Sequence, residues 1–203
     1  MIEAGDERIV LNVGCGPRDA AGLPGLFNPW RKIRVDVDES VQPDIVADLT
    51  DLSPVPTGSV HAVWAAHCIE HLYIHQVPIA LAEFRRVLRP DGFMCVIVPD
   101  LQTVAKYLVA DRAHEPLYRS PAGPVTAHDI IFGFSPEIAG GRTAMAHRCG
   151  FTPASLQRCF QGLPLGELVL RRRAAQLELA AVARATPAKD EADRAALMSA
   201  LEL

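Results

Sequence analysis

The stretch RIVLNVGCG at residues 8–16 decides the fold. Residues 8–13 form a compact apolar run, which is typical of a strand buried on both faces of a parallel sheet. Gly14 and Gly16 follow at once, and because they lack a Cβ the backbone can turn sharply there. Ligands of open parallel sheets bind beyond the carboxyl ends of the strands, so this turn is the first candidate binding element.

Strands and helices alternate along the first half of the chain. Apolar residues recur at helical spacing from Gln76 to Leu88, and Asp100 can cap a further helix. Four more short apolar runs predict strands at residues 33–37, 44–47, 60–66 and 93–98. This alternation predicts a mostly parallel sheet with helices on both of its faces.

The composition excludes several classes of protein. Lys and Arg number 20 against 24 Asp and Glu, a net charge of −4, which argues against a nucleic-acid-binding surface. No apolar run reaches about 18 residues, so no membrane span is expected. The acidic N-terminus lacks the features of a signal peptide. Five cysteines without a Cys-x-x-Cys pair indicate reduced thiols and a cytoplasmic protein.

Acidic residues follow the second and third predicted strands. Asp36 lies 22 residues after Gly14, where a carboxylate can accept two hydrogen bonds from a ribose diol. Asp48, which Leu49 follows, can meet an adenine edge. The glycine turn and the two acids together predict an adenosine pocket. A nicotinamide dinucleotide fits less well, because its motif needs a third glycine where Asp19 would face the pyrophosphate.

Five segments, in this order, resemble successive motifs of class I S-adenosylmethionine-dependent methyltransferases, most closely the small type-11 group. They are LNVGCG (11–16), RVDVD (34–38), DIVADLTDL (44–52), HAVWAAHCIEHL (61–72) and EFRRVLRPDGFMCVIVPDL (83–101). The segment MAHRCGFTPASL (145–156) also resembles a downstream feature of such proteins. The resemblance implies a Rossmann-like, doubly wound, mostly parallel seven-stranded sheet, with helices on both faces and an antiparallel strand at the C-terminal end.

The length of 203 residues fits a single domain. We expect it at residues 1–185, divided into a cofactor-binding half (8–110), a lid or acceptor loop (111–150) and a C-terminal helix and strands (151–185), followed by a tail (186–203). The loop is expected because residues 111–150 are rich in Pro, Gly and His and show weak periodicity. Residues 174–185 fit a helix by propensity and a strand by alternation, so their structure stays open.

The resemblance also implies which residues bind the cofactor. Gly14 and Gly16 would line the methionine part of S-adenosylmethionine, and Asp36 would take the ribose hydroxyls. Asp48 and Leu49 would recognise the adenine. The full expected set is Asn12, Gly14, Cys15, Gly16, Asp36, Val37, Asp48, Leu49 and His67.

The expected reaction is a direct methyl transfer, in which an acceptor attacks the sulfonium methyl in line and S-adenosylhomocysteine departs. The protein then contributes mainly positioning and desolvation. The resemblance implies that His67 borders the sulfonium and the acceptor. If the acceptor must lose a proton, His67, His128 or His147 could act as the base.

Residues 67–71, HCIEH, also match the zinc pattern His-x-x-Glu-His, and His75 follows four residues later. This segment lies at the end of a buried strand and not within a long helix, and no third ligand is evident. We therefore expect no metal site. Cys15 is expected to be a small residue that fills the turn, not a nucleophile.

The negative charge and the lack of an added recognition domain favour a small-molecule or glycan-precursor acceptor. Asn12 stands where many members of the family have an acid that orders the glycine turn. This departure, with the Pro- and Gly-rich insert, leaves open a non-catalytic, methyltransferase-like partner subunit. A nicotinamide-dependent reductase is a weaker alternative. Nothing in the sequence indicates an oligomer, and the acceptor and the atom methylated stay open.

Overall fold

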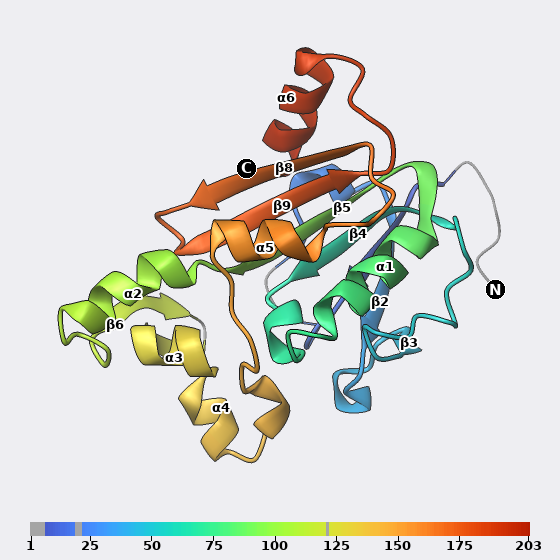
Figure 1. The fold of residues 1–203 in the computed structure, drawn as a ribbon. Coiled ribbons are helices and arrows are strands. Elements are labelled where there is room, and N and C mark those ends of the chain that lie inside the picture. Colours follow the sequence, from blue (N-terminus) through green and yellow to red (C-terminus); the bar gives the residue numbers. More distant parts are fainter. Residues whose placement is uncertain (1–6, 19–21, 121) are drawn as a thin grey trace.

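The computed structural model describes residues 7–18, 22–120 and 122–203. Figure 1 shows its central sheet of seven strands, in the order β3-β2-β1-β4-β5-β9-β8. These strands are β1 (Ile9–Val13), β2 (Arg31–Asp36), β3 (Ile45–Val46), β4 (Val60–Ala66), β5 (Leu88–Pro99), β8 (Glu167–Arg173) and β9 (Glu178–Arg184). A separate two-stranded sheet is formed by β6 (Pro116–Ser120) and β7 (Gly123–Thr126). The strands β1 to β5 pair in parallel, whereas β9 runs antiparallel to both of its neighbours. This architecture confirms the predicted fold class.

Helices cover both faces of the sheet, as predicted. They are α1 (Val77–Val87), α2 (Leu101–Val109), α3 (Ala127–Phe132), α4 (Ser135–Ala139), α5 (Pro153–Cys159) and α6 (Glu191–Ala200), with short 3-10 helices η1 (Gly25–Phe27), η2 (Glu39–Val41), η3 (Ile69–His71) and η4 (Thr143–Met145). On one face α1 and α5 bury Leu81 and Leu156, and on the other η1 and α6 bury Phe27 and Met198. Residues 186–203, expected as a tail, thus contribute to the core. None of the helices in the described ranges has the length and apolarity that a membrane crossing requires.

β9 resolves the open question about residues 174–185, because residues 178–184 form a strand and not a helix. Ala181 and Ala183 pack into the core on one face of the sheet, and Val182 packs into the core on the other. Since β9 lies between β5 and β8, neighbours cover it on both edges as well. Strand pairing and two-sided burial therefore override the helix propensity of this alanine-rich segment.

β5 is longer than predicted, since it begins at Leu88 and not at Phe93. Leu88 pairs with Val60, and Phe93 pairs with Ala62, so the register shifts between these pairs. Residues 89–92 therefore form an irregularity inside the strand, with the extra residues on the β5 side.

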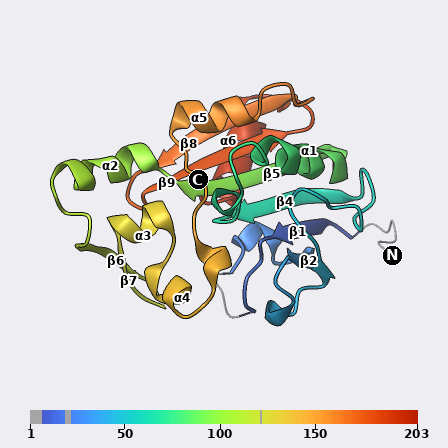
Figure 2. The same cartoon turned by 60° about the horizontal axis from the view of Figure 1, so that its bottom comes forward.

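Residues 111–150, called the lobe below, are not a loop. They contain the β6–β7 pair, α3, α4 and η4, each of three to six residues. An apolar cluster that includes Val104, Val125 and Ile130 joins the lobe to α2. Figure 2 shows the lobe beyond the arrowheads of β4 and β5. Elements this short do not produce a recognisable periodicity in the sequence, which is why the lobe was expected to lack structure.

An ion pair within α1 holds the loop that leads into β4. Arg86 Nε lies 2.7 Å from Glu83 Oε1. The Arg86 guanidinium also donates to the carbonyl oxygens of Leu52 and Val55, and the Leu52 N–H donates to Glu83. Charged side chains that bond backbone groups stabilise a loop more than neutral ones do, so this network fixes the segment between β3 and β4.

We expect Arg86→Ala to lower the free energy of unfolding by about 1.5–3 kcal/mol, because two backbone carbonyls lose their donor and Glu83 loses its partner. Chemical denaturation followed by circular dichroism measures this change. Arg171→Ala, at an exposed arginine of β8, is the matched control and should change the same free energy by less than about 0.5 kcal/mol. Equal effects of the two substitutions would contradict the role given to Arg86.

Candidate functional site

The carboxyl ends of the parallel strands meet around β1, where the strand order reverses. Val13, the last residue of β1, is aligned with Val35 of β2 on one side and with Ala65 of β4 on the other. An open α/β sheet binds its ligand at such a switch point. The turn Gly14–Gly16 therefore leaves β1 at the centre of the candidate site.

The turn needs glycine at its first residue for two reasons. Gly14 has φ +60° and Gly16 has φ +59°, a left-handed conformation that side chains disfavour. A Cβ on Gly14 would also lie only 2.4 Å from the Cβ of Cys68, in the segment after β4. The turn thus packs directly against that segment, and no side chain fits between them.

The carboxylate of Asp36 connects the end of β2 to the glycine turn. Its Oδ2 accepts a hydrogen bond from the Gly16 N–H at 2.9 Å, and its Oδ1 accepts one from the Asp38 N–H at 3.0 Å. The Arg34 guanidinium donates to the carbonyl oxygens of Gly16 and Gln42. Each Asp36 oxygen accepts only one backbone N–H, so the carboxylate keeps lone pairs for further donors.

The end of β3 lies beside the end of β2. The Ala47 N–H donates to the Asp36 carbonyl oxygen at 3.0 Å, and the exposed Asp48 follows directly. Asp48 Oδ1 accepts from the Thr50 N–H and hydroxyl, which fixes its side chain. Val37, at the end of β2, exposes 63% of its surface and is an unpartnered apolar residue at this edge. The structure thus brings the three predicted strand tips together, while their role in binding stays a prediction.

The other predicted residues of the turn have a structural explanation. Asn12 lies half-buried in β1, and the Cys15 N–H donates to the Val35 carbonyl oxygen. Burial raises the pKa of the Cys15 thiol, which leaves little of the thiolate that a nucleophile needs. Asp19, used above against a dinucleotide, lies outside the described residues.

His67 stands at the end of β4 between two carboxylates. Its Nε2 lies 2.9 Å from Glu178 Oε1, and its Nδ1 lies 3.5 Å from Glu70 Oε1. Removal of the ring from water lowers the pKa of His67, but the bonds to Glu178 and then Glu70 outweigh this and raise the pKa above its usual range. An imidazole that is already protonated at neutral pH cannot accept a proton, which argues against His67 as the base.

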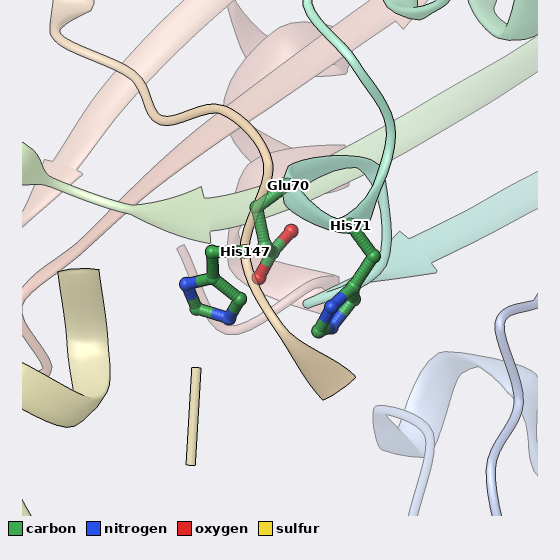
Figure 3. Close-up of side chains that lie close together, drawn as sticks. All are labelled: Glu70, His71 and His147. Carbon is green, nitrogen blue, oxygen red and sulfur yellow. The ribbon is translucent and has the colours of Figure 1, made fainter. Parts of the chain in front are cut away.

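Glu70, His71 and His147 form a second group, shown in Figure 3. The Glu70 carboxylate, only 1% exposed, lies beside the two imidazole rings, whose centroids are 4.9 Å apart. His147 Nδ1 lies 2.9 Å from the Ile130 carbonyl oxygen. Burial lowers the pKa of His147, so this ring is neutral at neutral pH.

His128 is the third histidine that the sequence suggested as a base. Its ring packs at tilted angles against those of His114 and Phe132 in the lobe, and it does not belong to the group around Glu70. Glu178 and Glu70 were not expected from the sequence to be site residues. Glu70 follows His67 by three residues in a quoted motif, whereas no sequence signal points from β9 to His67.

A surface depression of about 440 Å³ lies elsewhere, lined in part by Gly58, Leu88 and Leu163. Gly58 and Leu88 stand at the amino ends of β4 and β5. Because bound ligands of this fold contact the carboxyl ends, the depression is not the candidate site.

The family comparison points to one class of enzyme. A family model described as a methyltransferase domain matches residues 11–96. This stretch contains the glycine turn, Asp36, Asp48 and His67. No curated protein matches the chain.

Solved structures share the fold at low identity. One is a SAM-dependent methyltransferase from Archaeoglobus fulgidus, with a TM-score of 0.56, 14% identity and coverage of 88% of this chain and 86% of that chain. A SAM-dependent methyltransferase from Methanosarcina mazei has a TM-score of 0.57 and 14% identity, over 89% of this chain and 93% of that chain.

A further solved structure contains ligands. It is the Burkholderia thailandensis 1,6-didemethyltoxoflavin-N1-methyltransferase with bound 1,6-didemethyltoxoflavin and S-adenosylhomocysteine. Its TM-score is 0.51 at 18% identity, over 89% of this chain and 72% of that chain. The match of residues 11–96 to a methyltransferase domain and the fold shared with SAM-dependent methyltransferases support a class I S-adenosylmethionine-dependent methyltransferase of the type-11 group.

Proposed function

We propose that this protein transfers the methyl group of S-adenosylmethionine to a small-molecule or glycan-precursor acceptor at the carboxyl ends of β1 to β4. The observation that carries the proposal is the hydrogen bond from the Gly16 N–H to the Asp36 carboxylate. It joins the turn that leaves β1 to the acid that ends β2, at the point where this fold binds nucleotides.

The donor set at the strand tips fits a nucleoside. The free lone pairs of Asp36 suit a ribose diol, and the exposed Val37 offers an apolar surface to one face of an adenine ring. Asp48 and the half-buried Leu49 stand at the adjacent tip, where the adenine edge would contact them. Gly14, Cys15 and Gly16, together with Asn12, would line the methionine part, because this backbone has no side chain bulk at Gly14 and Gly16.

S-adenosylmethionine supplies a methyl group on a positively charged sulfur. The residues of this chain bind the nucleoside, hold the sulfur end near His67 and exclude water from the acceptor. Glu70 and Glu178 fix the His67 ring from two sides, so it acts as a positioning residue and not as a base. His147 and His128 stay proposals for the base, and only His147 lies in the cluster beside Glu70.

The lobe is the proposed acceptor side of the site. It extends beyond the carboxyl ends of β4 and β5, and its segment around His147 contacts η3 directly, through the Arg148 N–H and the Glu70 carbonyl oxygen at 2.9 Å. A net charge of −4 supports a small acceptor over a nucleic acid. The Burkholderia thailandensis structure, with bound 1,6-didemethyltoxoflavin and S-adenosylhomocysteine, is an example of this fold that holds an acceptor together with the nucleoside product.

We also infer that the protein works in the cytoplasm. All five cysteines are free, and four of them are buried. Free buried thiols are typical of a reducing compartment.

Asp36→Asn should weaken the binding of S-adenosylhomocysteine about tenfold to a hundredfold, because the ribose hydroxyls lose a charged acceptor while the amide oxygen can still accept from Gly16. Isothermal titration calorimetry on the folded variant measures the dissociation constant. Asp38→Asn, two residues on, is the matched control and should bind like the original protein. Unchanged affinity in Asp36→Asn, or no binding by the original protein, would contradict the proposed site.

Gly14→Ala should abolish detectable binding of S-adenosylhomocysteine, because the new Cβ would collide with Cys68 and displace the turn. Gly58→Ala is the matched control, since Gly58 has a similar φ of +64° but nothing within 4 Å of its Cβ position. Both substitutions introduce left-handed strain of about 1 kcal/mol. Any greater loss of thermal stability in Gly14→Ala than in Gly58→Ala therefore reports the collision with Cys68 and not the strain. A Gly14→Ala protein that binds S-adenosylhomocysteine as tightly as Gly58→Ala would be evidence against the proposed role of the glycine turn.

A further inference from the structure

The carboxylate of Glu70 is buried without a hydrogen-bond partner. Its side chain is 1% exposed, and neither Oε1 nor Oε2 has a partner among the described residues. The nearest cation is His67, whose Nδ1 lies 3.5 Å from Oε1, but this ring forms its hydrogen bond with Glu178. Apart from this ion pair with His67, the buried carboxylate has no hydrogen bond, so it keeps lone pairs for a further ligand.

The two histidines beside Glu70 have the orientation that metal-binding histidines adopt. The Nδ1 atom of His147 lies 2.9 Å from the Ile130 carbonyl oxygen, and that of His71 lies 3.3 Å from the Ala146 carbonyl oxygen. A carbonyl can only accept, so both Nδ1 atoms carry the proton. The Nε2 atom of each ring is then the one that faces away from its carbonyl partner and can bind an ion, as in histidine ligands that a backbone carbonyl orients.

The three side chains offer their ligand atoms at one point. One nitrogen or oxygen from each of Glu70, His71 and His147 lies within 4.8 Å of the others, and Figure 3 shows the three side chains close together. In the part of the chain that the structure describes, no Glu70 oxygen forms an ion pair with His71 or His147. The gap is too wide for a hydrogen bond and suits side chains that share a small ion.

The backbone keeps these residues in place without an ion. The N–H groups of Arg148 and Cys149 both donate to the Glu70 carbonyl oxygen, at 2.9 and 3.2 Å. The His147 N–H donates to the Phe132 carbonyl oxygen at 3.1 Å. The ligands therefore come from two segments that are distant in the sequence and already joined, which lowers the cost of assembling a site.

We propose that Glu70, His71 and His147 bind a divalent first-row transition-metal ion, which joins η3 to the lobe. Two imidazoles and one carboxylate suit Zn²⁺, Co²⁺ or Fe²⁺, whereas Mg²⁺ and Ca²⁺ prefer oxygen ligands. Three protein ligands leave at least one coordination position for water or another ligand.

This site differs from the one weighed from the sequence. The His-x-x-Glu-His pattern suggested His67 and His71 on one helix face, but η3 has three residues, and His67 is bound to Glu178. The third ligand, His147, comes from the lobe and replaces His67. An ion on Nε2 of His147 would occupy the lone pair that a base needs, so the metal site and the base role of His147 exclude each other.

Metal binding can be measured without any methyl acceptor. Protein freed of metal by dialysis against a chelator is titrated with Zn²⁺ by calorimetry and with Co²⁺ by visible absorption, with Mg²⁺ as a comparison. We expect one equivalent of Zn²⁺ to bind, Co²⁺ to give ligand-field bands of an imidazole-containing site, and Mg²⁺ to bind far more weakly. His147→Ala and Glu70→Gln should each weaken Zn²⁺ binding by at least about tenfold.

Two histidine variants provide the matched controls. His75→Ala removes an exposed histidine four residues after His71, and His128→Ala removes another histidine of the lobe. Both should bind Zn²⁺ like the original protein. Thermal unfolding of each metal-free variant shows whether it folds, and His147→Gln is used if His147→Ala does not.

Two results would overturn the proposal. The first is a folded original protein that binds neither Zn²⁺ nor Co²⁺. The second is Zn²⁺ binding that persists in Glu70→Gln and His147→Ala or that disappears in a control variant. Binding of S-adenosylhomocysteine to the same samples is measured in parallel, so failure of the metal site and failure of the nucleoside site are distinguishable.

Discussion

The hydrogen bond between the Gly16 N–H and the Asp36 carboxylate is the interaction on which the site depends. Parallel pairing aligns the ends of β1, β2 and β3, but alignment alone would leave the turn after β1 free to take other conformations. The Asp36 side chain fixes the turn from one side. The close approach of Gly14 to Cys68 fixes it from the other, so the ends of β2 and β4 together determine the backbone between them.

The part of the site around His67 is formed by the segment after β4. His67 has φ +52°, an unusual conformation for a residue with a side chain, which it holds while its ring bridges Glu70 and Glu178. Glu178 belongs to β9, the antiparallel strand beside β5. The C-terminal hairpin thus completes the sheet and also supplies a partner for His67. The backbone bonds from Arg148 and Cys149 to Glu70 then connect the lobe to the same segment.

The sequence predicted what depends on local patterns. The strand 60–66 was predicted with its observed bounds, and Asp100 caps α2 as expected, because capping and apolar runs act between near neighbours in the chain. It could not predict the pair of His67 and Glu178, which are 111 residues apart. The proximity of His147 to Glu70 could not be predicted either, since it depends on how the lobe packs against η3. Alternation of apolar residues indicated a strand at residues 174–185, but the helix propensity of the same residues left the choice open.

The most direct test is a crystal structure of the protein with S-adenosylhomocysteine. Our account predicts the ribose hydroxyls within hydrogen-bond distance of Asp36, the adenine between Val37 and Leu49 with its edge toward Asp48, and the sulfur near His67. A ligand bound anywhere else, such as the depression beside Gly58 and Leu88, with Asp36 facing only water, would contradict it.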